Sequence, residues 1–391
     1  MKTPIYLLLC GLSLTFLACR APINPRVNFS GTTYVEGNEP ITEVLLGFSL
    51  SEATTQAVTI NYSTDDGTAK AGLDYVPIMG GALVIPPGET KGDVVLELIG
   101  DNYREAVESV QIVINSVENA EVFFDRGVIN IADDDYELDI PDEGYSTPKT
   151  YPGYNLVWAD EFDGTSLDLD NWSYIVGDGC PNVCGFGNNE LQIYTNERDN
   201  LFLTDDCMVI EAQQVTGGYR SARIRSLGKQ EFQYGRIDIR AMMPVGQGIW
   251  PALWMMGDDS ETTGWPACGE IDIMEYLGHE ESTTHGTVHF GEDWTQHRFK
   301  GNSYSLPAGT FHEKFHVFTI IWEENLIEWY VDDVFFFRIT PADLGGETWR
   351  FDHPFYFLVN MAIGGNWPGS PDASTQFPQR MFVDYIRVFQ Q

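Results

Sequence analysis

Short runs of alternating apolar and polar residues recur along most of the chain, and this period of two predicts β-strands rather than helices. In the first third of the sequence, clusters of glycine, proline and aspartate separate the runs at the spacing typical of an antiparallel β-sandwich. We expect residues 28–135 to form this first domain. Its predicted strands are Val44–Leu50, Val58–Tyr62, Val94–Ile99 and Ser109–Ile114.

A second and larger set of strands follows residue 153, where all ten tryptophans of the chain lie. No long amphipathic helical window competes with these strands, so we expect residues 153–391 to form one large sandwich and the fold class to be all-β. Residues 136–152 hold three prolines and polar spacers, which predicts an interdomain linker. The predicted strands are Met208–Ala212, Tyr234–Met242, Ile249–Met255, Val317–Trp322, Glu328–Val331, Phe355–Met361 and Met381–Phe389.

Residues 1–19 have the composition of an export signal, with Lys2 before an apolar run that ends at Phe16. The run is too short for a transmembrane helix. Cys19 follows Ala18 directly, which resembles a bacterial lipoprotein site, although Phe16 departs from the usual aliphatic residue there. We therefore expect an exported protein, lipid-anchored at a bacterial cell envelope or surface. Cleavage and secretion is the alternative.

The charge balance limits which molecules the protein can bind, because the chain has 58 acidic and 22 basic residues and a net charge of −36. Nucleic acid binding needs a basic surface, which this composition does not supply. Repulsion also disfavours sulfated or uronic polysaccharides. We expect a monomer that acts on a neutral substrate and meets a membrane only through a lipid anchor.

Four cysteines remain after export, and in an oxidising compartment they predict disulfides without fixing the pairing. Cys180 and Cys184 are close enough in sequence to close a small loop. Half of a zinc site is the alternative, but no second Cys/His pair stands nearby at metal-ligand spacing. We therefore favour a local disulfide and expect Cys207 and Cys268 to be free.

The segment from Gly269 reads Gly-Glu-Ile-Asp-Ile-Met-Glu-Tyr and carries the strongest chemical signal. On a regular strand, Glu270 and Asp272 share one face, and Glu275 points to the other. A one-residue bulge at Ile273–Met274 would return Glu275 to the acidic face. We therefore predict a row of three carboxyl groups on a single strand. A solvated acidic strand face is the alternative interpretation.

With the bulge, Glu270 and Glu275 lie roughly 13 Å apart between Cα atoms, at about 3.3 Å per residue. Side chains that lean together could bring their carboxyl groups to about 5 Å, the separation of retaining glycosidases. Asp272 between them adds a like charge, and such crowding raises at least one carboxyl pKa. A turn centred near Ser282 would place His289 opposite Glu275, where a hydrogen bond from the histidine could adjust the pKa of that carboxyl group.

The first domain carries a series of short motifs, which are Val35-Glu36-Gly37, Asp65-Asp66-Gly67-Thr68-Ala69, Gly72-Leu73-Asp74-Tyr75, Glu108, and Ile131-Ala132-Asp133-Asp134-Asp135. On these motifs it resembles the Calx-β domain, an immunoglobulin-like sandwich. Some members bind calcium through acids at strand ends, which here implies Glu36, Asp66, Glu108, Asp133 and Asp134. Turn capping by these acids is the alternative.

Further motifs accompany the acid row over nearly the whole second domain. They are Leu156-Val157-Trp158-Ala159-Asp160-Glu161-Phe162-Asp163-Gly164, Asn188-Asn189-Glu190-Leu191-Gln192, Ser221-Ala222-Arg223-Ile224, Tyr234-Gly235-Arg236, Gly248-Ile249-Trp250-Pro251-Ala252-Leu253-Trp254, His285-Gly286-Thr287-Val288-His289, Gly365-Asn366-Trp367-Pro368-Gly369 and Val383-Asp384-Tyr385-Ile386-Arg387-Val388. On these motifs the domain resembles glycoside hydrolase family 16, in particular its laminarinase-like, endo-β-1,3-glucanase branch. The likeness implies a concanavalin-like β-jelly roll with a concave substrate cleft.

The resemblance implies that Glu270 is the nucleophile, that Glu275 is the acid/base and that Asp272 holds the nucleophile, with no cofactor for catalysis. It also implies a structural calcium with Glu161 and Asp384 among its ligands. Aromatic planes suit the C–H faces of sugar rings, and polar groups suit their hydroxyls. The substrate-binding candidates are Trp250, Trp254, Trp265, Trp367, Arg223, Asn189 and Glu190; core packing is the alternative for Trp250 and Trp254.

The leading hypothesis is retaining, endo-acting hydrolysis of β-1,3-glucan of the laminarin type. The six-residue acid motif with its extra residue, Met274, belongs to the laminarinase and agarase side of the family, whereas lichenases lack that residue. Hydrolysis of mixed-linkage β-1,3-1,4-glucan and an agarase-like activity are the alternatives. Transglycosylation would use the same residues. Pure glucan binding is disfavoured because Glu270 and Glu275 are both present.

Overall fold

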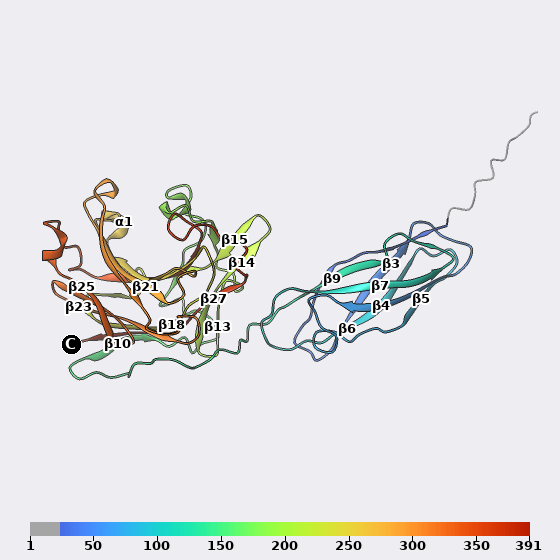
Figure 1. Ribbon diagram of the computed structural model, residues 1–391, viewed down its shortest axis with the longest axis horizontal. Helices are drawn as coiled ribbons and strands as arrows, with labels where there is room; N and C mark the ends of the chain where they lie inside the picture. Colours follow the sequence, from blue (N-terminus) through green and yellow to red (C-terminus); the bar gives the residue numbers. More distant parts are fainter. Residues whose placement is uncertain (1–23) are drawn as a thin grey trace, which may run out of the picture. The chain divides into compact units, whose positions relative to one another are not determined.

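The computed structural model describes residues 24–391, so the predicted export segment lies outside the described residues. The chain divides into two compact units, the first ending at Asp135 and the second running from Tyr136 to Gln391 (Figure 1). Among the described residues, no helix is long and apolar enough to cross a membrane.

The first unit is a sandwich of two sheets, and all four strands predicted for it are present. Alternate residues of each strand are buried between the sheets, among them Leu46, Ile60, Leu96 and Ile112, all fully covered. The four-stranded sheet has the order β6 (Lys91–Leu98), β3 (Thr42–Leu50), β1 (Arg26–Phe29), β8 (Glu121–Val122). The five-stranded sheet has the order β2 (Thr33–Val35), β9 (Arg126–Ala132), β7 (Glu108–Glu118), β4 (Val58–Asp66), β5 (Gly81–Ile85).

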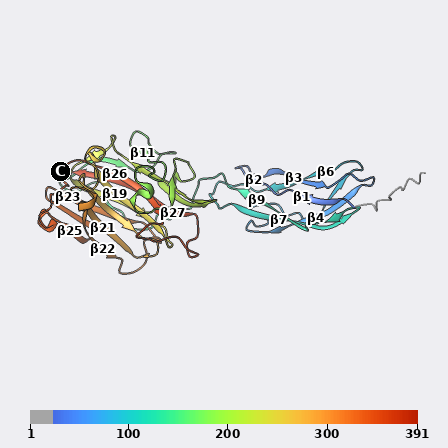
Figure 2. The ribbon, with the colours of Figure 1, turned by 90° about the horizontal axis from the view of Figure 1, so that it is seen from above.

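The second unit is a larger sandwich, and its seven predicted strands are likewise confirmed. One sheet has the order β12 (Gln192–Tyr194), β15 (Gly218–Ser221), β14 (Cys207–Val215), β27 (Gln379–Gln390), β18 (Gly235–Met242), β23 (His316–Glu323), β24 (Leu326–Val331), β25 (Val334–Ile339), with β10 (Asn155–Asp160) on β27 and β13 (Leu201–Thr204) on β14. The other has the order β11 (Ser173–Tyr174), β16 (Arg223–Arg225), β26 (Phe355–Ile363), β19 (Ile249–Gly257), β20 (Glu270–Tyr276), β21 (Thr283–Phe290), β22 (Arg298–Ser305), with β17 (Glu231–Phe232) on β26 (Figure 2).

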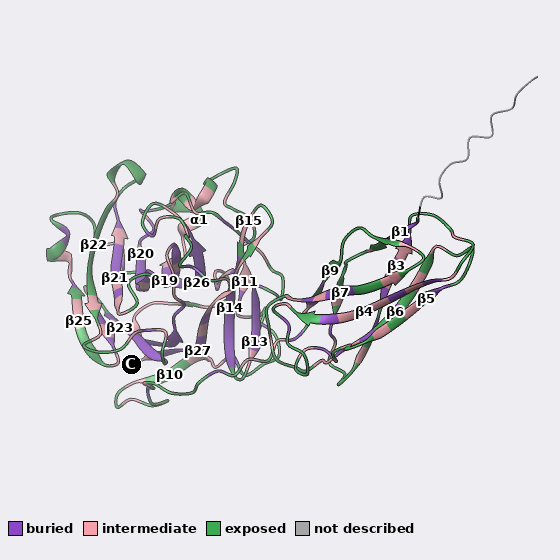
Figure 3. Ribbon diagram, turned by 45° about the vertical axis from the view of Figure 1, so that its right-hand side comes forward, coloured by how far each residue is buried: buried purple, intermediate pink, exposed green. Residues whose placement is uncertain are grey.

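One apolar core fills the space between these two sheets, and the buried residues concentrate in their central strands (Figure 3). The helical segments are short: α1 (Ser260–Thr263), and the 3₁₀ turns η1 (Cys184–Gly187), η2 (Trp294–Gln296) and η3 (Pro341–Leu344). Cys180 and Cys184 form the predicted disulfide, and Cys207 and Cys268 are free and buried.

The bulge predicted in β20 is present at the predicted residues. Asp272 pairs with Thr287 and Glu275 pairs with His285, so that Ile273 and Met274 together face a single residue of β21. The pairing of β20 with the neighbouring strand β19 shows the same irregularity. Leu253 pairs with Met274, and the next residue, Trp254, already pairs with Asp272. Both bulge residues are buried in the core. The irregularity therefore turns Glu275 to the face that carries Glu270.

A tryptophan from the opposite sheet supports the bulge. Trp329 on β24 is fully buried, and its indole N–H donates to the backbone carbonyl of Asp272 at 2.8 Å. A Cβ added to Gly286, the residue opposite the bulge, would come within 2.5 Å of the Trp329 ring. Glycine at position 286 thus leaves room for the Trp329 ring, whose N–H pairs with a backbone oxygen in the core. An unpaired backbone oxygen there would be costly.

The segment predicted as a linker, residues 136–152, instead packs on the second unit. Ile140 joins an apolar cluster on the outer side of the ten-stranded sheet, and the backbone of Tyr145 pairs with Phe315 at 3.0 Å. Tyr385 accepts from the backbone N–H of Thr147 at 2.8 Å. The prolines and polar spacers of this segment indicated an absence of regular structure, and the buried residues between them hold it against the sheet.

We predict that Trp329→Phe lowers the free energy of unfolding of the second unit by about 2–4 kcal/mol, from the lost hydrogen bond and the cavity. Denaturant unfolding of the full chain measures the change. Trp349→Phe is the matched control, because the indole N–H of the part-buried Trp349 is buried without a hydrogen-bond partner. Equal losses in the two variants would show that the bond to Asp272 contributes nothing.

Candidate active site

Three carboxyl groups lie on the face of β20 that points away from the core. Glu270 and Glu275 are partly covered and Asp272 is buried, whereas Ile271 and Ile273 point into the core between the sheets. The structure therefore gathers Glu270, Asp272 and Glu275 on one face, as the sequence predicted. Neighbouring strands β19 and β21 flank the row on both sides.

His289 lies opposite Glu270 and not opposite Glu275, so the register predicted for the hairpin was wrong. Two consecutive turns connect the strands, because Glu280 N–H donates to the Leu277 carbonyl and Thr283 N–H to the Glu280 carbonyl, each at 2.7 Å. The connection is therefore centred near Glu280, two residues before the predicted centre. His285 takes the place opposite Glu275.

Glu270 has two nitrogen neighbours. The indole N–H of Trp265 donates to Glu270 Oε2 at 3.0 Å. His289 Nε2 lies 3.7 Å from Glu270 Oε1 and 3.3 Å from Asp272 Oδ2, so it serves both carboxyl groups. Glu275 has a weaker hydrogen-bond donor, since its Oε1 accepts from the indole N–H of Trp250 at the longer distance of 3.3 Å.

Burial raises the pKa of both outer carboxyl groups. The pKa of Glu270 rises to about 8, through burial first and then the Asp272 charge, while His289 and the Trp265 hydrogen bond act in the opposite direction. Burial and Asp272 also raise the pKa of Glu275 to about 8. Burial raises the pKa of Asp272 well above its ordinary value. The row therefore holds protons near neutral pH.

The contacts separate the roles of the two glutamates. Hydrogen-bond donors and cations stabilise a carboxylate over a carboxylic acid. The indole N–H donor is closer to Glu270, at 3.0 Å, than the one at Glu275, at 3.3 Å, and the imidazole of His289 lies 3.7 Å from Glu270. These contacts favour an ionised Glu270 over an ionised Glu275. One ionised and one protonated carboxyl group is the pairing that general acid and nucleophilic chemistry require.

Four predicted tryptophans surround the row. Trp250 and Trp254 are partly exposed on the outer face of β19, which excludes core packing for both. Trp265 and Trp367 are 38% and 43% exposed, enough to offer a ring face to a ligand. Trp367 packs edge-on against Trp250 at 5.5 Å and against His285 at 4.9 Å. Aromatic surface therefore lies beside both Glu270 and Glu275.

The three polar candidates have different environments. The Arg223 guanidinium lies over the rings of Phe186 and Trp254, at 4.7 and 4.9 Å from their centres, and its Nε is buried without a hydrogen-bond partner. Asn189 donates to Asn366 at 2.8 Å and stays exposed. Glu190, in contrast, accepts from neighbours in its own segment, Asn188, Gln192 and Tyr194, which indicates a local structural role.

Two residues near the row were missed from the sequence. Asn360 on β26 accepts from the Trp254 indole at 2.8 Å and donates to Tyr194 at 3.1 Å. It is the polar residue inside the apolar strand Phe355–Ile363, a signal that could have identified it. His297 bonds to His289 at 2.8 Å. Its position in a connection between strands gave no periodic signal.

The structural calcium predicted at Glu161 and Asp384 does not fit the observed donors. Both carboxylate oxygens of Glu161 bond to Arg387, at 2.7 and 2.8 Å, and Lys149 lies 2.9 Å away. Asp384 pairs with Arg240 at 2.5 Å. Guanidinium groups already neutralise these acids, so a further cation there would meet repulsion. The sequence identified the acids but not their basic partners.

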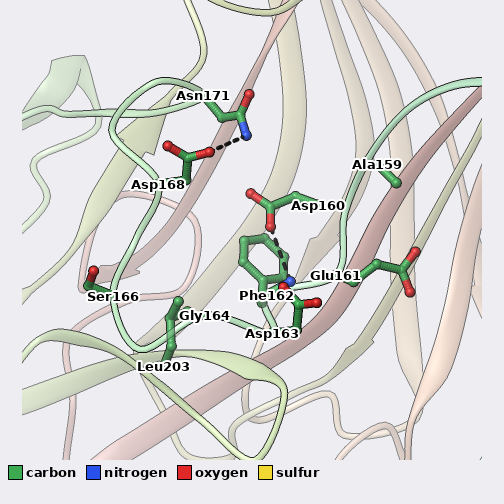
Figure 4. Close-up of a pocket in the computed structure, with 10 residues that line it drawn as sticks. All are labelled: Ala159, Asp160, Glu161, Phe162, Asp163, Gly164, Ser166, Asp168, Asn171 and Leu203. Atoms are coloured by element: carbon green, nitrogen blue, oxygen red, sulfur yellow. Dashed lines mark hydrogen bonds between the residues drawn. The ribbon is translucent and has the colours of Figure 1, made fainter.

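A pocket of about 440 Å³ lies beside Glu161 (Figure 4), and no residue of the carboxyl row lines it. Two of its acids are engaged locally: Asp160 accepts from Phe162 N–H and from the Trp172 indole, and Asp168 accepts from Asn171. These hydrogen bonds shape the loop after β10. The pocket is therefore a structural feature of that loop.

The first unit carries two acidic clusters. The ligand atoms of Glu36, Asp133 and Asp135 approach within 4.8 Å of one another, and so do those of Asp74, Glu105 and Glu108. Two further predicted acids have other partners. Asp66 accepts from Ala71 N–H and the Tyr75 hydroxyl, and Asp134 accepts from Gly37 N–H. The structure therefore brings together Glu36 and Asp133 among the predicted ligands, and it places Glu108 in the second cluster.

Comparison with known families divides the chain in the same way. Residues 188–387 match glycosyl hydrolases family 16, and residues 23–135 match the Calx-beta domain. A glucan endo-1,3-beta-glucosidase A1 of Niallia circulans is 40% identical over 63% of this chain and 39% of its own length. The chain therefore spans less than half of that relative.

Two further relatives are covered more fully. A beta-glucanase of Rhodothermus marinus is 39% identical over 61% of this chain and 86% of its own length. The solved laminarinase catalytic domain of Thermotoga maritima is 46% identical, with a TM-score of 0.57, over 61% of this chain and 98% of the other. These similarities lie on the second unit, which carries the carboxyl row.

We predict that Glu270→Gln raises the melting temperature of the second unit by about 2–6 °C at about pH 9 and leaves it unchanged at about pH 4. The folded-state pKa of about 8 lies above the ordinary 4.5, so ionisation of Glu270 costs stability. This loss of stability is absent at a pH below the ordinary pKa of 4.5, and it is complete at a pH above the folded-state pKa of about 8.

Calorimetry of the full chain at both pH values measures this effect. Glu347→Gln is the control, because Glu347 is exposed. A Glu270→Gln variant whose melting temperature does not change with pH relative to the parent would contradict the electrostatic cost.

Proposed function

Because the chain belongs to glycosyl hydrolases family 16, we propose that it is a retaining endo-β-1,3-glucanase whose substrate is a neutral glucan of the laminarin type. The observation that supports this best is the row of three carboxyl groups on β20, with one donor set favouring ionised Glu270 and a weaker one at Glu275. The relatives named endo-1,3-beta-glucosidase and laminarinase support the same substrate class.

In the proposed mechanism, Glu270 attacks the anomeric carbon while Glu275 donates its proton to the departing glycosidic oxygen. A covalent glycosyl ester on Glu270 results. Glu275, now ionised, removes a proton from water, and this water releases the sugar with retained configuration. Asp272 and His289 position Glu270 and adjust its pKa, because His289 contacts both acids.

The surroundings of the row favour binding within a long chain. Trp265 lies at the Glu270 side, and Trp250 with Trp367 lies at the Glu275 side, so sugar rings could rest on aromatic surface on either side of the cleaved bond. This supports endo-acting cleavage. The net charge of −36 favours an uncharged polysaccharide over a sulfated one.

We expect laminarin to be the best substrate of the full chain among laminarin, lichenan, agarose and κ-carrageenan, with oligosaccharides as early products. Glu270→Ser removes the nucleophile and should lower kcat at least about a thousandfold. Reducing-end assays and product chromatography measure both. Lichenan as the best substrate would favour the mixed-linkage alternative, and agarose as the best substrate the agarase-like one.

The mechanism has a separate readout in the anomeric signals of the first product. Proton NMR during early hydrolysis should show the β-anomer first and its slow conversion to the α-anomer. An α-anomer formed first would indicate inversion and would exclude a glycosyl ester on Glu270. Activity that survives Glu270→Ser would also overturn the assigned nucleophile.

We also propose that the first unit binds calcium at its two acidic clusters. Glu36 is 4% exposed, and its Oε1 is buried without a hydrogen-bond partner. Burial, followed by Asp133 and Glu105, raises the pKa of Glu36 to about 8. Arg104 at 3.3 Å from Asp133 supplies one positive charge. The remaining negative charge suits a hard cation with oxygen ligands.

Calcium at about 1 mM should raise the melting temperature of the first unit of the full chain, because a ligand that binds only the folded state stabilises it. Glu36→Gln and Glu108→Gln should each reduce this rise. Glu118→Gln on the exposed end of β7 is the control. A melting temperature that calcium and chelator leave unchanged would contradict the proposal.

A further inference from the structure

The connection between β21 and β22 places a second histidine behind His289. It contains η2 and ends at His297, directly before β22. The side chain of Asp293 caps η2 by accepting from the N–H groups of Thr295 and Gln296 at 2.8 and 3.2 Å. Gly291 closes the connection, because a Cβ there would come within 2.5 Å of the Gln296 carbonyl. His297 therefore has a defined position.

His297 contacts both side chains that contact Glu270. Its Nε2 lies 2.8 Å from His289 Nδ1, and the two imidazole planes are nearly parallel, at 12° and 5.0 Å between centres. It also contacts the Trp265 indole, with 4.6 Å between ring centres. Trp265 lies in the connection between β19 and β20 and His289 lies on β21, and His297 is a contact that they share.

We infer that His297 is a positioning residue for the nucleophile, which holds the His289 tautomer and the Trp265 ring so that both keep their contacts with Glu270. This inference rests on the proposed function. His297 itself does not touch the reacting atoms. It acts through the two side chains that do contact Glu270.

The tautomer follows from the groups that face each nitrogen. His289 Nε2 faces the carboxyl oxygens of Glu270 and Asp272, which accept hydrogen bonds, so the proton belongs on Nε2. Nδ1 is then left as an acceptor. His297 Nε2–H donates to it and thereby fixes the ring. Without that donor, His289 is free to carry its proton on Nδ1 and to present a lone pair to the carboxylates.

The charges around His297 agree with its role as an uncharged donor. Burial, followed by His289 and Arg298, lowers the pKa of His297 below its ordinary value. On the His289 side, the facing titratable groups are Glu270 and Asp272 of β20, and Glu275 acts on Glu270 from the end of the row. Trp250 and Trp254 of β19 carry no titratable group.

Two substitutions separate the hydrogen bond to His289 from the ring contact with Trp265. His297→Phe keeps a ring against Trp265 but removes the donor to His289. His297→Gln keeps an N–H donor but removes the ring. We expect His297→Phe to lower kcat on laminarin about tenfold with KM changed less than about twofold. We also expect it to move the acidic limb of kcat/KM upward by about 0.5–1 pH unit.

The direction of the shift follows from the contacts. An Nε2–H that points at the Glu270 carboxylate stabilises its ionised form, so a His289 with its proton on Nδ1 leaves the Glu270 pKa higher. Activity is then lost at a higher pH as the solution is acidified. His297→Gln should keep the acidic limb of the parent. The inference would be overturned if His297→Phe kept the acidic limb of the parent kcat/KM profile. It would also be overturned if both variants lost the same share of kcat with no shift of that limb.

A measurement on the parent chain does not depend on how the variants fold. Long-range ¹H–¹⁵N NMR of the histidine rings should show His289 protonated on Nε2 and unprotonated on Nδ1 near neutral pH. A proton on Nδ1 with a bare Nε2 would overturn the inference. Glu270→Ser is assayed in parallel: if it remains active, the proposed function fails, whereas an inactive Glu270→Ser beside an unshifted His297→Phe removes the role of His297 alone.

Discussion

One irregularity in β20 determines what the second unit can do: Ile273 and Met274 together face a single residue of β21. Without the bulge that these two residues form, Glu275 would point into the apolar core, where an ionisable group is very costly. With it, three carboxyl groups stand on the outer face within one strand. The bulge is held from behind by the Trp329 indole on the Asp272 carbonyl, and Gly286 leaves the room for that ring.

Three acids on one face cost folding free energy, and the neighbouring strands offset only part of this. Indole N–H groups of Trp265 and Trp250 and the imidazole of His289 approach the row, yet the pKa values of Glu270 and Glu275 both remain raised to about 8. This residual cost is typical of a functional site and unusual in a structural one. The large apolar core between the two sheets supplies the stability that such a site requires.

Periodicity was sufficient to predict the strands and the bulge, because side-chain alternation fixes which residues share a face. It could not fix the register of the β20–β21 hairpin, since that depends on hydrogen bonds of Leu277 and Glu280 in the connection. The linker prediction failed for a related reason: composition indicates irregular backbone but not whether Ile140 is buried. Pairing between distant charges, as for Glu161 with Arg387, is set by the folded structure and leaves no local pattern.

The two glutamates of the row are chemically identical, so any division of labour between them must come from their surroundings. Glu270 has an indole donor at 3.0 Å and an imidazole that also serves Asp272, whereas Glu275 has one indole at 3.3 Å. These donors come from connections and neighbouring strands and not from β20 itself. A chain could therefore keep the acid motif unchanged and still lose the distinction between nucleophile and acid. Under the proposed mechanism, the motif identifies the kind of chemistry, while the residues behind it, Trp265, His289 and His297, decide which carboxyl group performs each step.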